Sequence, residues 1–96
     1  VKVKGVNIFP SQIEEMLSAI EGASSEYQFM IDHLCGKDIC TLFVEANPGV
    51  NHYELETEIT QAFKYKIGVL VITKPVEIGE LPRSEKKSTR VFDNRY

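Results

Sequence analysis

The residues best suited to chemistry lie near the C-terminus, in the run ELPRSEKKSTRVFDNRY, which contains five basic residues. Lys87 and Arg90 are separated by two residues, close enough along the chain to serve one anionic ligand. A lysine side chain is cationic at neutral pH, and its long stem can reach across an interface. The sequence has no Gly-x(4)-Gly-Lys-Ser/Thr phosphate loop, so we expect these side chains to supply charge to a ligand held elsewhere.

A solvated, frayed terminus is the simpler interpretation of such a basic run, and the residues alone leave it open. Leu81-Pro82 favours a functional segment, because proline restricts the backbone where the segment leaves the domain. The close spacing of Lys87 and Arg90 favours it too.

The N-terminal part of the chain predicts a strand followed by a helix. Residues 1–9 alternate valine with lysine, the period of a half-buried strand, and Gly5 interrupts them. Apolar residues then recur at helical spacing, and Ser11 and Glu14 have the spacing of a capping box. Gly22 is placed to end this helix.

The middle of the chain predicts a hairpin, a second helix and a buried strand. Residues 25–49 alternate as two strands joined by a turn at Gly36-Lys37-Asp38. Asn51 and Glu54 form a second capping pattern, and Gly68 ends the second helix. The continuously apolar run VLVIT, residues 69–73, is typical of a strand that is buried on both sides or lies at the centre of a sheet.

The order β-α-β-β-α-β predicts an α+β fold, a ferredoxin-like sandwich with two helices on one face of a mainly antiparallel sheet. An irregular basic segment follows, with a short edge strand at residues 91–93. Aromatic residues of the expected strands and helices are assigned to the core: Tyr27, Phe29, Phe43 and Phe63.

Composition bounds the function. A 96-residue chain with 43% hydrophobic and 26% charged residues is typical of one globular domain. A net charge of -3 argues against nucleic acid, and no apolar run reaches the roughly 20 residues of a membrane helix. The N-terminus shows no secretory signal, and a start at Val1 rather than methionine predicts a fragment of a longer protein.

The two cysteines, Cys35 and Cys40, do not predict a metal site. A structural zinc site needs four ligands, and only His33 and His52 could complete it, at unrelated spacings. We therefore predict two reduced cysteines flanking a turn, and no bound metal.

Two blocks of sequence, KGVNIFPSQIEEML at residues 4–17 and LPRSEKKSTRVFDNR at residues 81–95, resemble the C-terminal domain of phenylacetate–coenzyme A ligases, a branch of the acyl-adenylate-forming superfamily. The intervening elements agree with that family in order and length. The resemblance implies a two-step reaction. Phenylacetate and ATP give an acyl-adenylate and diphosphate, and coenzyme A then displaces AMP to form the thioester.

The resemblance also implies roles for individual residues. Lys87 takes the position of the catalytic lysine of the adenylation step, although Lys86 stands where the family pattern has glycine. Gly5, with Lys4 before it, takes the position that lines the coenzyme A passage, whereas a strand bulge is the alternative. Arg90 matches a basic position that could contact phosphate or the interface, or form only a surface salt bridge.

The remaining expectations concern the whole protein. Residues 1–96 would be the mobile C-terminal domain, with a catalytic-lysine tail at 76–96, and its partner would be an N-terminal adenylation domain of the same chain. That absent domain would hold ATP, Mg²⁺ and the acid, so the fragment alone is predicted to bind no cofactor and to be inactive. A cytoplasmic location is expected, and a homodimer of the full-length enzyme is left open. The alternative is a stand-alone small-molecule-sensing or dimerisation module of the same fold.

Overall fold

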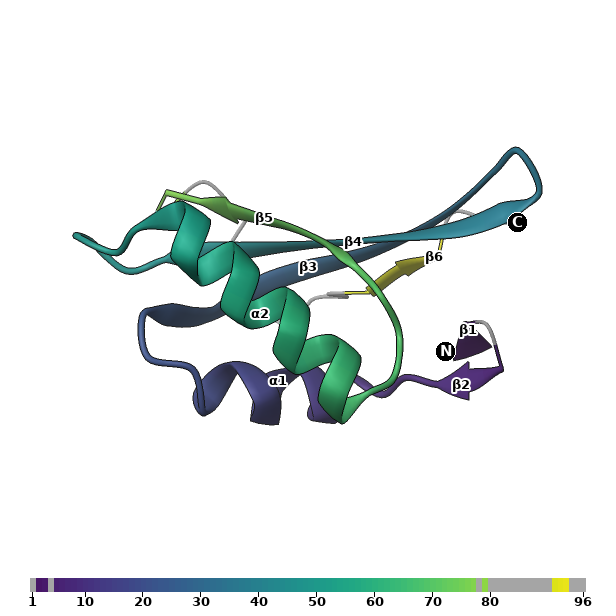
Figure 1. Ribbon diagram of the computed structural model, residues 1–96, viewed down its shortest axis with the longest axis horizontal. Helices are drawn as coiled ribbons and strands as arrows, with labels where there is room; N and C mark the ends of the chain where they lie inside the picture. Colours follow the sequence, from purple (N-terminus) through teal and green to yellow (C-terminus); the bar gives the residue numbers. More distant parts are fainter. Residues whose placement is uncertain (1, 4, 78, 80–90, 94–96) are drawn as a thin grey trace.

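A computed structural model describes residues 2–3, 5–77, 79 and 91–93, which form two helices and six strands (Figure 1). In chain order the elements are β1 (Lys2–Val3), β2 (Val6–Asn7), α1 (Pro10–Ser18), β3 (Ala23–Leu34), β4 (Lys37–Ala46), α2 (His52–Lys66), β5 (Ile72–Val76) and β6 (Val91–Asp93). In Figure 1 both helices lie beneath a four-stranded sheet, and β1 and β2 lie at the end toward which the β3–β4 turn projects.

The strands of the main sheet follow the order β5-β4-β3-β6. β3 and β4 pair antiparallel, whereas β5 runs parallel to β4 and β6 runs parallel to β3. The predicted α+β class is confirmed, and so are the two helices on one face of the sheet (Figure 1). The detail differs from the prediction, because the sheet is mixed rather than mainly antiparallel and the strand predicted at residues 1–9 does not join it.

That N-terminal strand stays separate because the chain reverses at Gly5, whose φ is +79°. β1 and β2 therefore pair with each other, Lys2 opposite Asn7 and Val3 opposite Val6. Each is two residues long, and the outer edge of β3 is occupied by β6 instead. The predicted edge strand at residues 91–93 is confirmed as β6.

One hydrophobic cluster joins both helices to the sheet. Phe29 of β3 and Phe63 of α2 are fully buried and stack with ring centroids 5.6 Å apart. Burying one such side chain contributes about 1.5–3 kcal/mol. Tyr27 is buried as predicted. Phe43 is only half-buried and lies on the face of the sheet away from the helices, where the Lys74 ammonium nitrogen is 5.9 Å from the centroid of its ring.

The first helix begins differently from the prediction, and the predicted capping box of Ser11 and Glu14 is wrong. Ser11 lies inside α1, and Pro10 occupies the first helical position, where its missing N–H is not needed. Phe9 is the cap, and its backbone N–H donates to the side-chain oxygen of Gln12 at 3.0 Å. The cap predicted for α2 is confirmed, because the Asn51 side chain accepts from the backbone N–H of Glu54 at 3.1 Å.

The β3–β4 turn lies one residue earlier than predicted. Leu34 pairs with Lys37, so the loop consists of Cys35 and Gly36 alone. Their φ angles of 53° and 77° are both positive, as a type I′ turn requires. Cys35 and Cys40 are not joined by a disulfide, and Cys35 is exposed within the turn while Cys40 is buried in β4.

The prediction for the apolar run at residues 69–73 is wrong. β5 begins only at Ile72, and it is an edge strand paired with β4 on one side. Val69 and Val71 are buried, whereas Leu70 is 61% exposed and Ile72 is 50% exposed. Burial alternates along the run because only one face of the sheet meets the helices, and four consecutive apolar residues have no periodicity that could show this.

Candidate functional site

The N-terminal β1–β2 hairpin carries Gly5, the predicted site residue that the structure describes. Gly5 lies in the loop between the paired Val3 and Val6. Gly5 is exposed, and a Cβ built on it meets no atom within 4 Å. The positive φ is one that residues with a side chain rarely adopt. Gly5 therefore offers solvent a backbone surface with open space beside it, and the alternative of a strand bulge is wrong.

Buried apolar residues hold this hairpin against the domain. Val3 is fully buried on one side of the loop, and Ile8, just after β2, is 1% exposed. Both belong to the same cluster as the sheet and the helices, and Val6 packs against it. The residues on both sides of the exposed loop are thus packed into the hydrophobic core, and this packing limits the motion of the loop relative to the sheet.

Tyr27 of β3 links the sheet to the start of α1, two residues after the hairpin. Its hydroxyl lies 3.2 Å from a carboxylate oxygen of Glu14 and 3.4 Å from the backbone oxygen of Pro10, and it can donate to either. A hydrogen bond to a carboxylate is among the stronger ones in proteins. The sequence pattern identified Tyr27 as a core residue but could not show this link, because its partners lie 13 and 17 residues away.

The other predicted site residues, Lys4, Lys87 and Arg90, lie outside the described residues, and so does Lys86. The described parts of the predicted tail are Val76, Glu77, Gly79 and residues 91–93. β5 and β6, which come before and after the basic run, lie at opposite edges of the sheet. The geometry at Lys87 therefore remains a prediction from the sequence.

Within the described ranges, no group of three or more His, Cys, Asp or Glu side chains could hold a metal ion. The part of the chain that the structure describes also contains no helix long and apolar enough to cross a membrane. Among the described residues, the candidate site therefore consists of the exposed glycine loop at Gly5 on the well-packed β1–β2 hairpin.

Comparisons with known proteins match nearly the whole chain. The family model described as the AMP-binding enzyme C-terminal domain matches residues 5–95. Phenylacetate-coenzyme A ligase of Escherichia coli K12 is 32% identical over 97% of this chain, but the match spans only 23% of that protein. A ligase of the same name from Pseudomonas putida is 29% identical over the same shares.

Two solved structures share the fold. A domain of phenylacetate-coenzyme A ligase from Bacteroides vulgatus has a TM-score of 0.87 and 34% identity, over 100% of this chain and 92% of that one. A 2-hydroxyisobutyryl-CoA ligase, in complex with 2-HIB-AMP and CoA in the thioesterification state, has a TM-score of 0.89 and 26% identity. The second match covers 98% of this chain and 21% of that one, so the chain corresponds to about a fifth of such a ligase.

Proposed function

The chain belongs to the family of AMP-binding enzyme C-terminal domains, and from this we propose that it is the C-terminal part of an acid–coenzyme A ligase that acts on phenylacetate. The observation that carries the proposal is the match to phenylacetate-coenzyme A ligases over 97% of this chain in sequence and 100% in structure. The full-length protein would convert phenylacetate, ATP and coenzyme A into phenylacetyl-CoA, AMP and diphosphate. No observation on the described residues favours a stand-alone sensing or dimerising module.

Lys87 is the proposed residue of the first step. There the carboxylate oxygen of the acid attacks the α-phosphorus of ATP, and diphosphate leaves. Two anions approach each other and negative charge develops around phosphorus, so an ammonium group at that position stabilises the transition state. The effect is largest when closure of the domains has excluded water. Arg90 would add a second cation toward the same phosphate or toward the interface.

Gly5 and Lys4 are the proposed residues of the second step, in which the thiol of coenzyme A attacks the acyl carbon and AMP leaves. The open space beside Gly5 and its place at the tip of a supported hairpin support this role. A loop without a side chain allows a ligand to pass close to the backbone. Lys4, next to it in sequence, would attract the anionic part of coenzyme A.

An N-terminal adenylation domain of the same chain would bind ATP, Mg²⁺ and the acid. The curated relatives that the chain matches are about four times its length, because the match covers 23% of each. The isolated chain is accordingly proposed to fold but to make no thioester, and the protein is proposed to act in the cytoplasm. A homodimer of the full-length enzyme is compatible with these roles.

The test measures the two half-reactions of the full-length protein separately, diphosphate release from ATP and phenylacetate, and thioester formation from supplied acyl-adenylate. Lys87→Ala should slow diphosphate release by roughly 10²–10³, as when one donor to a developing oxyanion is deleted, and should spare thioester formation. Lys64→Ala, an exposed lysine of α2, is the matched control and should change neither step.

Three results would count against these assignments. If Lys86→Ala stops the first step while Lys87→Ala does not, the segment is right and the residue is wrong. If the wild-type protein forms no phenylacetyl-CoA at all, or the 96-residue chain alone forms it, the proposed function is wrong.

A further inference from the structure

β3 carries a tyrosine whose hydroxyl reaches the helix that follows the Gly5 hairpin. The side chain of Tyr27 is buried in the core between β3 and α1. Its hydroxyl lies 3.2 Å from Glu14 Oε2 and 3.4 Å from the backbone oxygen of Pro10. A phenol has a single proton to donate, so it binds one of these oxygens at a time or shares the proton between them. In either case the polar end of an otherwise apolar side chain contacts the first turns of α1.

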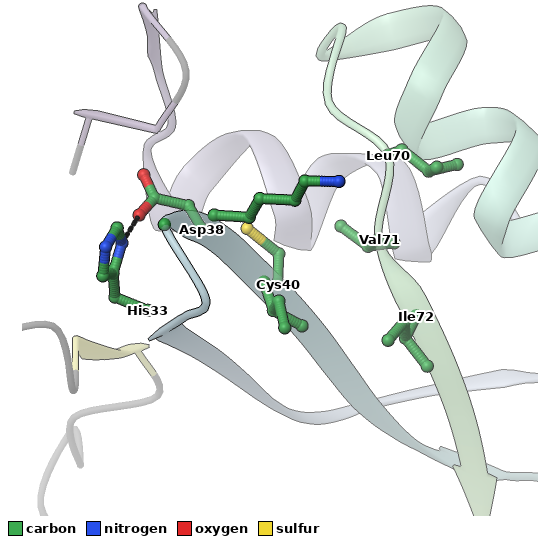
Figure 2. A pocket seen from close by; sticks show the side chains of 9 residues that line it. His33, Asp38, Cys40, Leu70, Val71 and Ile72 are labelled. Atoms are coloured by element: carbon green, nitrogen blue, oxygen red, sulfur yellow. Dashed lines mark hydrogen bonds and ion pairs between the residues drawn. The ribbon is translucent and has the colours of Figure 1, made fainter.

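This contact joins two separate elements, and in this it differs from the side-chain contact at the other end of β3. There the Nδ1 atom of His33 and the Oδ1 atom of Asp38 lie 2.9 Å apart, beside a cavity of about 620 Å³ (Figure 2). His33 and Asp38 are directly opposite each other in one hairpin, so their contact reinforces a pairing that the backbone already makes. The Tyr27 hydroxyl instead fixes the position of α1 relative to the sheet.

The residues between the Gly5 loop and α1 are tied together, so the position of the helix start also sets the position of the hairpin. The backbone N–H of Phe9 donates to the side-chain oxygen of Gln12 at 3.0 Å, and the backbone oxygen of Phe9 accepts from the N–H of Gln12 at 2.9 Å. Ile8 and Ile13, on either side of this cap, are buried in the core. β2 ends one residue before Ile8, so little free backbone separates the hairpin from the helix.

We propose that Tyr27 is a positioning residue for thioester formation: its hydroxyl holds the start of α1 on the sheet and thereby holds the Gly5 loop where coenzyme A passes. The proposal rests on the proposed function for the role of that loop. Tyr27 acts through the hairpin rather than on the reacting atoms, because its side chain is buried inside the domain. The proposed residue of the first step, Lys87, belongs to a segment that follows β5 in the chain, so diphosphate release should not depend on this contact.

The first test is Tyr27→Phe in the full-length enzyme, which removes one oxygen and leaves the buried ring in place. Misplacing a reacting group by about 1 Å costs about 10²-fold in rate, and a hairpin still packed through Val3 and Ile8 should shift by less. Thioester formation from supplied acyl-adenylate should therefore fall roughly tenfold. The loss should appear in kcat, with the KM for coenzyme A and the rate of diphosphate release within about twofold of wild type, because orientation and not affinity is changed.

Glu14 supplies a second variant and its conservative counterpart. Glu14→Ala removes one of the two acceptors and should slow thioester formation roughly threefold, the range expected for loss of one hydrogen bond. Glu14→Gln keeps a side-chain oxygen as acceptor and should stay within about twofold of wild type. The double variant Tyr27→Phe/Glu14→Ala should be no slower than Tyr27→Phe alone, because both changes remove the same contact.

Two controls separate positioning from a general loss of packing. Thr60→Val removes the 2.8 Å hydrogen bond between the side chains of Thr60 and Thr73, which joins the other helix, α2, to β5. Glu15→Ala removes an exposed carboxylate next to Glu14 on α1. Both variants should leave thioester formation within about twofold of wild type.

Four results would overturn the proposal. They are an equal loss in both half-reactions of Tyr27→Phe, no loss in either, and a loss in Thr60→Val as large as the loss in Tyr27→Phe. The fourth is a double variant that is slower than Tyr27→Phe by the full factor of Glu14→Ala, because the two side chains would then act independently.

Amide hydrogen exchange tests the contact without turnover. In the full-length Tyr27→Phe protein, the amides of residues 6–9 and 11–14 should exchange at least roughly threefold faster than in wild type, whereas those of α2 should exchange alike in both. Unchanged exchange at residues 6–14 would overturn the proposal even in an active ligase. Faster exchange in a protein whose wild type forms no thioester would overturn the proposed function and leave the structural role of Tyr27 intact.

Discussion

Substitutions at Gly5 should distinguish two effects of an added side chain: strain of the backbone at residue 5 and obstruction of the path of coenzyme A. Strain comes from the positive φ, whereas obstruction depends on the size of the side chain. The φ of +79° puts any residue with a Cβ into a left-handed conformation, which costs about 1–2 kcal/mol for most residues and less for asparagine. No atom lies within 4 Å of an added Cβ, so a larger side chain should add little further cost inside this domain. Strain should therefore be independent of side-chain size.

The stability arm uses the isolated domain. The corresponding domain of the Bacteroides vulgatus ligase was crystallised as a domain, which supports its folding alone. Gly5→Ala and Gly5→Leu should lower the melting temperature by similar amounts, roughly 4–8 °C for each kcal/mol in a domain of this size. Gly5→Asn should lower it less, because asparagine tolerates positive φ.

The activity arm uses the full-length enzyme and the two half-reactions. Gly5→Leu should slow thioester formation from supplied acyl-adenylate by about 10²-fold, the loss associated with misplacing a reacting group by about 1 Å. Gly5→Ala should cost much less, and neither variant should slow diphosphate release. The obstruction would come from outside this domain, since the domain itself leaves the space open.

Two outcomes would refute this reasoning. If Gly5→Leu destabilises the isolated domain by clearly more than Gly5→Ala does, the space beside Gly5 is occupied within the domain. If alanine and leucine slow thioester formation equally, backbone strain controls the step and the loop does not line the passage of coenzyme A.

Two further predictions concern the elements that support the site. Cys35→Asn should raise the free energy of unfolding by about 0.5 kcal/mol in urea denaturation, because asparagine followed by glycine suits a type I′ turn, whereas Cys35→Val should lower it. Phe63→Ala should lower the free energy of unfolding by about 3–5 kcal/mol through loss of a fully buried ring stacked on Phe29, while the exposed Tyr65→Ala should change it by less than about 0.5 kcal/mol. A loss below about 1 kcal/mol for Phe63→Ala would contradict the described core.

Part of the candidate site could be predicted from the sequence. Gly5 was identified by its resemblance to a family position, and the structure adds the hairpin tip and the open space beside it. The hydrogen bonds of Tyr27 could not be found in this way, because its hydroxyl meets partners more than ten residues away along the chain.

The sequence by itself determined the local features: the two helices, the cap at Asn51, the glycine that ends α2, and the faces of β3 and β4 that are apolar. These follow from backbone preference and periodicity, which act over a few neighbouring residues. Only the tertiary structure decided that β1 pairs with β2 outside the main sheet and that β5 is an edge strand. Strand partners are chosen by contacts between segments far apart in the chain, so the four apolar residues at 69–72 have the same pattern whether one face or both faces of the strand will be covered.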